Sequence, residues 1–175
     1  MAYSERKHIR LKNRDYSKPG YYFVTVCTKY GLKLLSSVGQ GQAPATYVTE
    51  LTRLGKIAQA QLLGLQDRYP SVSIDKYVIM PNHIHFIVQI REVAGASPRP
   101  TLMEIVGTFK SLTTRECNKI RDYSDKQLFQ SSFYEHVIRD KTSYFAVCKY
   151  IDENPRKWYE GMDQDILQPD FGMLF

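Results

Sequence analysis

Two histidines alternate in the segment PNHIHFIV, and they are the residues of this chain best suited to chemistry. Side chains two positions apart on a strand project from the same face, so His83 and His85 would present their imidazole rings side by side. A pair of parallel imidazoles is half of a site for a divalent metal ion. His-x-His pairs are also common on half-exposed strands, so the pair alone leaves a purely structural role open.

A second chemistry uses alternating histidines, because the histidine-triad nucleotide hydrolases carry three of them on one strand. The third position in this chain is Ile87, so the set is incomplete. Nucleotide hydrolysis is therefore kept as a less favoured alternative.

The segment TSYFAVCKYIDENPRKW has the pattern of a helix. Tyr150 and Asn154 are four residues apart and therefore share one face of that helix. A phenol can attack phosphorus and carry a DNA end as a covalent ester, and an amide oxygen one turn away can complete a metal site. Most single tyrosines on helices only pack, so this interpretation depends on the two histidines.

The composition favours an anionic partner. The net charge is +6 and the isoelectric point is about 9.2, and a basic domain of this kind most often meets nucleic acid. The 13 tyrosines strengthen this expectation, because aromatic rings among Lys and Arg suit stacking on unpaired bases. A basic protein without a nucleic-acid partner is the alternative.

The sequence predicts a cytoplasmic protein. No apolar run reaches the roughly 18 residues of a transmembrane helix, and no apolar stretch follows the basic N-terminus as it would in a secretory signal. The three cysteines lack CxxC spacing, which disfavours a disulfide framework or a zinc ribbon.

Hydrophobic periodicity predicts an α+β fold, a ferredoxin-like antiparallel sheet with helices packed on one face. Thr49 and Thr101 are the expected N-caps of the first two helices, and Pro155 is expected to end the third. The predicted strands span residues 21–28, 72–80, 83–90 and 133–140, a loose hairpin spans 32–49, and the helices begin near 49, 102 and 142.

Together these segments resemble the REP-associated tyrosine transposases, a branch of the single-tyrosine HUH transposases in which U is a hydrophobic residue. The resemblance runs over nearly the whole chain. One departure is Phe129-Gln130, where the family often has Trp before the Gln; it does not touch the chemistry. The matching segments are YSKPGYYFVTVCT, YVIMPNHIHFIV, TLMEIVGTFKSLTTRE, FQSSFYEHVIRD and YIDENPRKW.

The resemblance implies a metal-dependent, sequence-directed single-strand DNA endonuclease and strand transferase that acts on hairpin DNA through a 5′-phosphotyrosine intermediate. His83 and His85 match the family's metal ligands. Tyr150 matches the nucleophile, and Asn154 matches a further ligand. A hairpin-binding protein of the same fold that no longer cuts DNA is the first alternative function.

The family further implies Mg²⁺ or Mn²⁺ as the ion and single-stranded or hairpin DNA as the partner, with no membrane and either a monomer or a homodimer. One HUH-type transposase domain is expected over residues 1–175, with a basic arm at 1–20 and a tail at 156–175. Several basic residues are candidates for gripping phosphates, although solvated charge is the simpler explanation for each: Arg6, Lys7, Arg10, Lys12 and Arg14 in the arm, and Lys110, Arg115 and Lys119 on the second helix.

Overall fold

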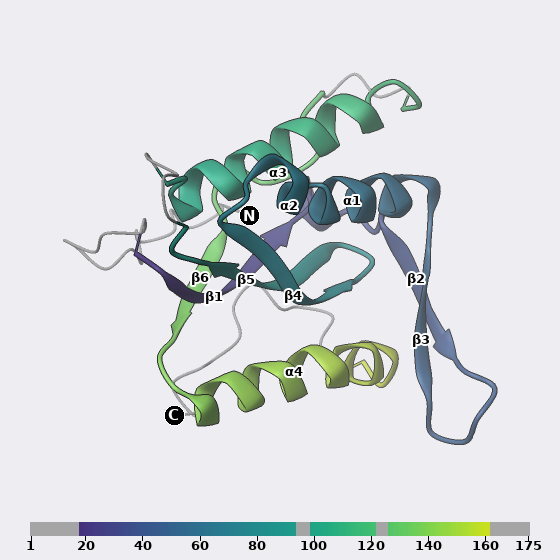
Figure 1. Cartoon of the computed structure of the whole chain (residues 1–175). Coiled ribbons are helices and arrows are strands. Elements are labelled where there is room, and N and C mark those ends of the chain that lie inside the picture. Colours follow the sequence, from purple (N-terminus) through teal and green to yellow (C-terminus); the bar gives the residue numbers. More distant parts are fainter. Residues whose placement is uncertain (1–17, 94–98, 122–125, 162–175) are drawn as a thin grey trace, which may run out of the picture.

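The computed structural model describes residues 18–93, 99–121 and 126–161 (Figure 1). At its centre is a four-stranded antiparallel sheet in the order β4-β5-β1-β6. The strands are β1 (Gly20–Cys27), β4 (Val72–Ile79), β5 (His83–Ile90) and β6 (Tyr134–Ile138). The sequence therefore predicted all four strands of the sheet, and the α+β class is confirmed.

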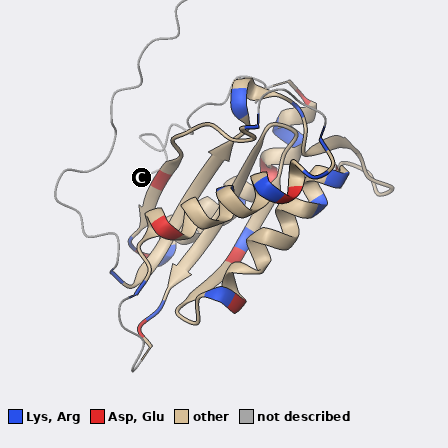
Figure 2. Cartoon of the chain, turned by 90° about the horizontal axis from the view of Figure 1, so that it is seen from above, with Lys and Arg blue, Asp and Glu red and all other residues tan. Residues whose placement is uncertain are grey.

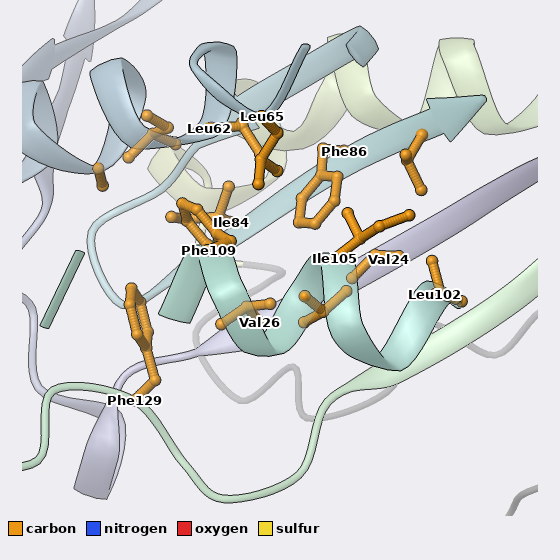
Figure 3. Close-up of a cluster of buried hydrophobic side chains, with 14 of the residues drawn as sticks. Val24, Val26, Leu62, Leu65, Ile84, Phe86, Leu102, Ile105, Phe109 and Phe129 are labelled. Atoms are coloured by element: carbon orange, nitrogen blue, oxygen red, sulfur yellow. The ribbon is translucent and has the colours of Figure 1, made fainter. Parts of the chain in front are cut away.

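Two helical connections cross one face of this sheet, which is the ferredoxin-like arrangement. Helices α1 (Arg53–Leu63) and α2 (Leu65–Arg68) connect β1 to β4, and α3 (Leu102–Cys117) connects β5 to β6. Figure 3 shows Ile105 and Phe109 of α3 directed at side chains of the central strands, such as Val24 and Phe86. These apolar contacts form the larger of the two cores.

Helix α4 (Lys141–Tyr159) lies on the opposite face of the sheet (Figure 1). Its Val147 and Ile151 pack against Phe23 and Ile87 of the central strands. The expectation that all helices pack on one face is therefore wrong for α4. Strands β1 and β5 are buried on both faces over most of their length, so their apolar side chains need a cover on each side.

The first helix begins three residues later than the sequence pattern indicated. Thr52, not Thr49, is the N-cap, and its hydroxyl accepts a hydrogen bond of 3.1 Å from the Gly55 amide. The residues before it form the second strand of a hairpin, β2 (Ser36–Gln40) with β3 (Tyr47–Leu51). A polar β-hairpin carries little periodicity, so the helical pattern wrongly included Leu51, the last residue of β3. The predicted cap at Thr101 is confirmed, with a complete capping box.

Pro155 does not end α4, which continues to Tyr159. A proline inside a helix removes one backbone hydrogen bond and costs about 3 kcal/mol. Asn154, Pro155 and Trp158 are all buried, so packing of this last part of the helix offsets the cost. Residues 156–159 consequently belong to the helix rather than to the predicted tail.

Polar and aromatic contacts along its length hold α4 in place. Near its start, the Tyr144 hydroxyl donates a hydrogen bond to Asp75 of β4. In its middle, Asp152 pairs with Lys76 of β4 at 2.8 Å. Near its end, the ring of Tyr159 lies 5.2 Å from that of Tyr47 in the β2–β3 hairpin, centroid to centroid.

None of the helices in the described ranges is long and apolar enough to cross a membrane.

Two helical glycines provide a matched test of the packing around α1. A Cβ at Gly55 would lie 1.9 Å from the carbonyl oxygen of Leu35, whereas one at Gly107 of α3 would meet nothing within 4 Å. Gly55→Ala should therefore lower the free energy of unfolding by about 3 kcal/mol. Gly107→Ala should raise it by about 0.5–1 kcal/mol because alanine is the better helix former. Urea titration followed by circular dichroism measures both, and equal effects of the two substitutions would contradict this packing.

Candidate active site

Strand β5 directs His83 and His85 to the face of the sheet that α4 covers. Both side chains are buried, with exposed fractions of 1% and 0%, and their ring centroids lie 4.5 Å apart. The side-by-side arrangement that the spacing predicted is therefore present. It lies under a helix rather than on a half-exposed surface.

The outer nitrogen of each imidazole has a polar neighbour. The Nδ1 of His83 donates to the Oδ1 of Asn82 at 2.7 Å. The Nδ1 of His85 lies 2.8 Å from the hydroxyl of Thr25, its partner on β1 in the antiparallel register. Such contacts orient both rings and leave the Nε2 atoms directed at α4.

Helix α4 supplies the other two predicted residues. The Oδ1 of Asn154 lies 3.3 Å from the Nε2 of His83, and the hydroxyl of Tyr150 lies 3.5 Å from the Nε2 of His85. The amide nitrogen of Asn154 donates to the backbone carbonyl of Tyr150 at 3.4 Å. That bond turns the amide oxygen toward the histidine. The structure thus brings all four predicted site residues together.

The facing atoms are suited to a cation. With Nδ1 of His83 donating to Asn82, a neutral ring has only a lone pair on Nε2, and this lone pair faces the amide oxygen of Asn154. Two acceptors face each other there without a proton between them. Two imidazole nitrogens and one amide oxygen are ligands that Mn²⁺ accepts, and Mg²⁺ would use the oxygen and added phosphate or water.

The third candidate metal ligand is the amide oxygen of Asn154. The described residues accordingly contain no cluster of three or more His, Cys, Asp or Glu side chains that could hold a metal ion. Burial keeps both imidazoles neutral. It lowers the pKa of His83 from 6.5 to about 4, against the opposing effect of the Asn154 side-chain oxygen, which can accept a hydrogen bond only from the protonated ring. Burial also lowers the pKa of His85, and the neighbouring His83 adds to the effect. Neutral imidazole is the form that binds a metal.

Aromatic rings form the walls of the site. Phe23 stacks on His85 with centroids 5.3 Å apart and meets the edge of Tyr150 at 6.0 Å. On the other side, the ring of Trp158 lies 5.9 Å from that of His83. Tyr150, Asn154 and Trp158 are spaced four residues apart and form one stripe of α4.

The three basic residues expected to bind DNA from the second helix are not gathered around this site. Lys110 donates to the carbonyls of Gln130 and Ser131 at 2.5 and 2.8 Å, and burial lowers its pKa. Arg115 and Lys119 each pair with Glu116 of α3. The five predicted cations of the arm lie outside the described residues: Arg6, Lys7, Arg10, Lys12 and Arg14.

Lys110 and Arg115 lie on α3, which covers the face of the sheet opposite to α4, and Lys119 lies just beyond the end of that helix. Lys110 and Arg115 line a cavity of about 650 Å³ between α3 and the segment that leads to β6. Figure 2, which looks onto α1 and α3, shows Lys and Arg interspersed with Asp and Glu rather than in one unbroken basic stripe. Any contact of these cations with DNA would therefore be separate from the histidine–tyrosine site.

A family model described as "Transposase IS200 like" matches residues 60–154, more than half of the chain. That range holds both histidines, the tyrosine and the asparagine of the site. The chain belongs to the IS200-like transposase family. The resemblance seen in the sequence motifs is confirmed at this level.

Two proteins and one solved structure are similar to this chain over most of its length. A Haemophilus influenzae protein of uncharacterised function is 33% identical over 94% of each chain. Another protein of that organism, whose name assigns it to the REP-associated tyrosine transposases, is 27% identical over 82% of this chain and 74% of its own length. A solved REP-associated tyrosine transposase bound to a REP hairpin is 22% identical, covers 88% of this chain and 76% of its own, and superposes with a TM-score of 0.60, which supports the fold.

Sequence reasoning missed the residues that support the histidines. Asn82 directly precedes the pair, so its position was a usable signal. Thr25 lies 60 residues away from His85, and only the strand register identifies it. Trp158 was missed because Pro155 was expected to end the helix before it.

The depressed histidine pKa values predict a pH-dependent stability of the metal-free protein. Below pH 6.5 the unfolded chain binds protons on His83 and His85. In the folded chain His83, with its pKa of about 4, stays neutral over this window, and burial also holds the pKa of His85 well below 6.5. The free energy of unfolding should therefore fall with falling pH in this window, by up to about 1.4 kcal/mol per pH unit for each histidine. Urea unfolding in chelator at several pH values measures the slope. His83→Gln should remove about half of the part of this slope that the two histidines cause. If the variant kept the wild-type slope, the lowered pKa of His83 would be contradicted.

Proposed function

We propose that this chain is a metal-dependent single-strand DNA endonuclease and strand transferase in which Tyr150 is the nucleophile. The observation that carries the proposal is the convergence of a phenol hydroxyl, two neutral imidazole nitrogens and an amide oxygen at one buried point. Membership of the IS200-like transposases supports the same chemistry. His83, His85 and Asn154 are the proposed ligands of Mg²⁺ or Mn²⁺.

Each residue has a distinct role in the proposed reaction. A divalent ion at this site would stabilise the negative charge that develops on the phosphate. Tyr150 attacks phosphorus, the bond to the 3′ oxygen breaks, and that oxygen leaves as a hydroxyl after gaining a proton. The 5′ phosphate stays on the phenol oxygen as an ester. A second 3′ hydroxyl can reverse the step, which transfers the strand without ATP.

The packing of α4 positions the nucleophile for this attack. Tyr150 is only 8% exposed, and its ring is held between Phe23 and His85. A phenol restrained in this way loses little freedom on reaching the in-line geometry. Because the tyrosine and both histidines come from one chain, a single copy supplies all proposed catalytic residues.

Hairpin DNA is the proposed substrate class. The support is the solved relative of the same fold, which is bound to a REP hairpin, and the Haemophilus influenzae relative named as a REP-associated tyrosine transposase. The histidine-triad alternative gains no support, because Ile87, at the position of the third histidine, packs in the apolar core beneath α4. A non-cutting hairpin-binding protein would have no use for the nucleophile beside the donor set.

Removing one hydroxyl tests the proposed function. Tyr150→Phe should abolish both cleavage of labelled hairpin DNA and the covalent protein–DNA adduct, while hairpin affinity stays within a few-fold. Tyr144→Phe and Tyr134→Phe should still cut, because Tyr144 donates to Asp75 instead of reaching the histidines and Tyr134 lies on β6. Denaturing gels and mass spectrometry of the trapped adduct measure the outcome. An adduct on any tyrosine other than Tyr150 would refute the assignment.

The single tryptophan of the chain provides a test of the metal site that does not depend on cleavage. Because the Trp158 ring lies 5.9 Å from that of His83, paramagnetic Mn²⁺ bound at the site should quench its fluorescence. Excess chelator should restore the signal, and diamagnetic Mg²⁺ should compete without quenching. His83→Ala and His85→Ala should each raise the Mn²⁺ concentration needed for half-maximal quenching by at least about tenfold. Saturable quenching that survives both substitutions would place the ion elsewhere.

A further inference from the structure

Two lysines lie against the aromatic walls of the site. The ammonium of Lys33 is 5.3 Å from the ring centroid of Trp158, and that of Lys157 is 5.0 Å from the ring centroid of Tyr150. These two rings flank the histidine pair. Two positive charges are therefore held beside a donor set that is itself neutral.

The helix geometry explains the position of Lys157. Seven residues separate it from Tyr150, which is almost two full turns, so the two side chains share one side of α4. Helical side chains lean toward the N-terminus, and the long stem carries the ammonium back over the tyrosine ring. Glu153, one turn before Lys157, pairs with it at 3.5 Å and with Lys149 at 3.7 Å.

Lys33 reaches the site from a different part of the chain. The backbone amides of its neighbours Leu34 and Leu35 both donate to the carbonyl of Pro81, at 2.8 and 2.9 Å. Pro81 belongs to the turn that leads into His83. These two hydrogen bonds therefore hold the backbone next to Lys33 close to the proposed metal site. Its side chain is exposed, and no carboxylate of the described residues lies within ion-pair distance of it.

We propose that Lys33 and Lys157 form a phosphate clamp that grips the backbone of the DNA strand crossing the site, one lysine on each side of the histidine pair. The ligand class rests on the proposed function. Each ammonium has only weak present partners, a ring face and, for Lys157, a shared and partly exposed glutamate. A DNA phosphate offers a charge-assisted hydrogen bond instead. When DNA binds, the ammonium group of Lys33 can therefore leave the Trp158 ring, and that of Lys157 the Tyr150 ring and Glu153, to contact a phosphate.

Salt dependence of binding tests the clamp directly. Each lost phosphate contact reduces the slope of log affinity against log salt by about 0.7 on single-stranded DNA. Lys33→Met and Lys157→Met keep the apolar stem but remove the charge. Each should reduce the slope by about 0.7 and the double variant by about 1.4, measured by fluorescence anisotropy with a labelled hairpin that carries a single-stranded flank.

Lys149→Met is the matched control, because Lys149 shares Glu153 with Lys157 but is 77% exposed and lies on no aromatic ring of the site. It should leave the slope unchanged. Unchanged slopes in both clamp variants, or an equal reduction in the control, would overturn the proposal. Lys157→Arg should restore the slope, which a merely structural effect of the methionine would not explain.

The assay separates the clamp from the proposed cleavage. All binding is measured in the Tyr150→Phe background and in chelator, so neither cleavage nor a bound metal contributes. If the unsubstituted protein cuts no hairpin but the slopes change as expected, the nuclease assignment fails and the clamp stands. If it cuts and the slopes do not change, the clamp fails alone.

Discussion

The packing of α4 against the central strands β1 and β5 is the contact on which the rest of the site depends. Phe23 and Ile87 on the sheet and Val147 and Ile151 on the helix form a small apolar core of their own. This core positions the stripe of α4 that carries the tyrosine and the asparagine. Without it, the histidine pair would face solvent and the Tyr150 hydroxyl would not lie beside it.

Burial then decides the chemistry of the site. Desolvation keeps His83 and His85 neutral, and their outer nitrogens are satisfied by Asn82 and Thr25. The inner nitrogens remain directed at the amide oxygen and the phenol of α4. A cation stabilises such a buried group of polar atoms. The proposed metal ion would bind these atoms directly, and the ammonium groups of Lys33 and Lys157 lie farther out, over the rings of Trp158 and Tyr150.

Local patterns failed where local and tertiary preferences compete. Thr49 and Thr52 are chemically equivalent N-caps, and only the pairing of β3 with β2 assigns the earlier one to a strand. Pro155 is a strong helix breaker in isolation, yet burial of Trp158 carries the helix past it. The placement of α4 on the second face follows from strands that are apolar on both sides, a property visible in the sequence but compatible with more than one helix arrangement.

The sequence by itself determined the strands of the sheet, the side-by-side histidines and the shared face of Tyr150 and Asn154, because each follows from the repeat of one strand or one helix. The capping box at Thr101 belongs to the same class of local rules. Only the tertiary structure decided which partners meet across elements. Thr25 opposite His85 and Lys33 over Trp158 are contacts between segments far apart in the chain. Register and packing create such contacts, and no local periodicity encodes them.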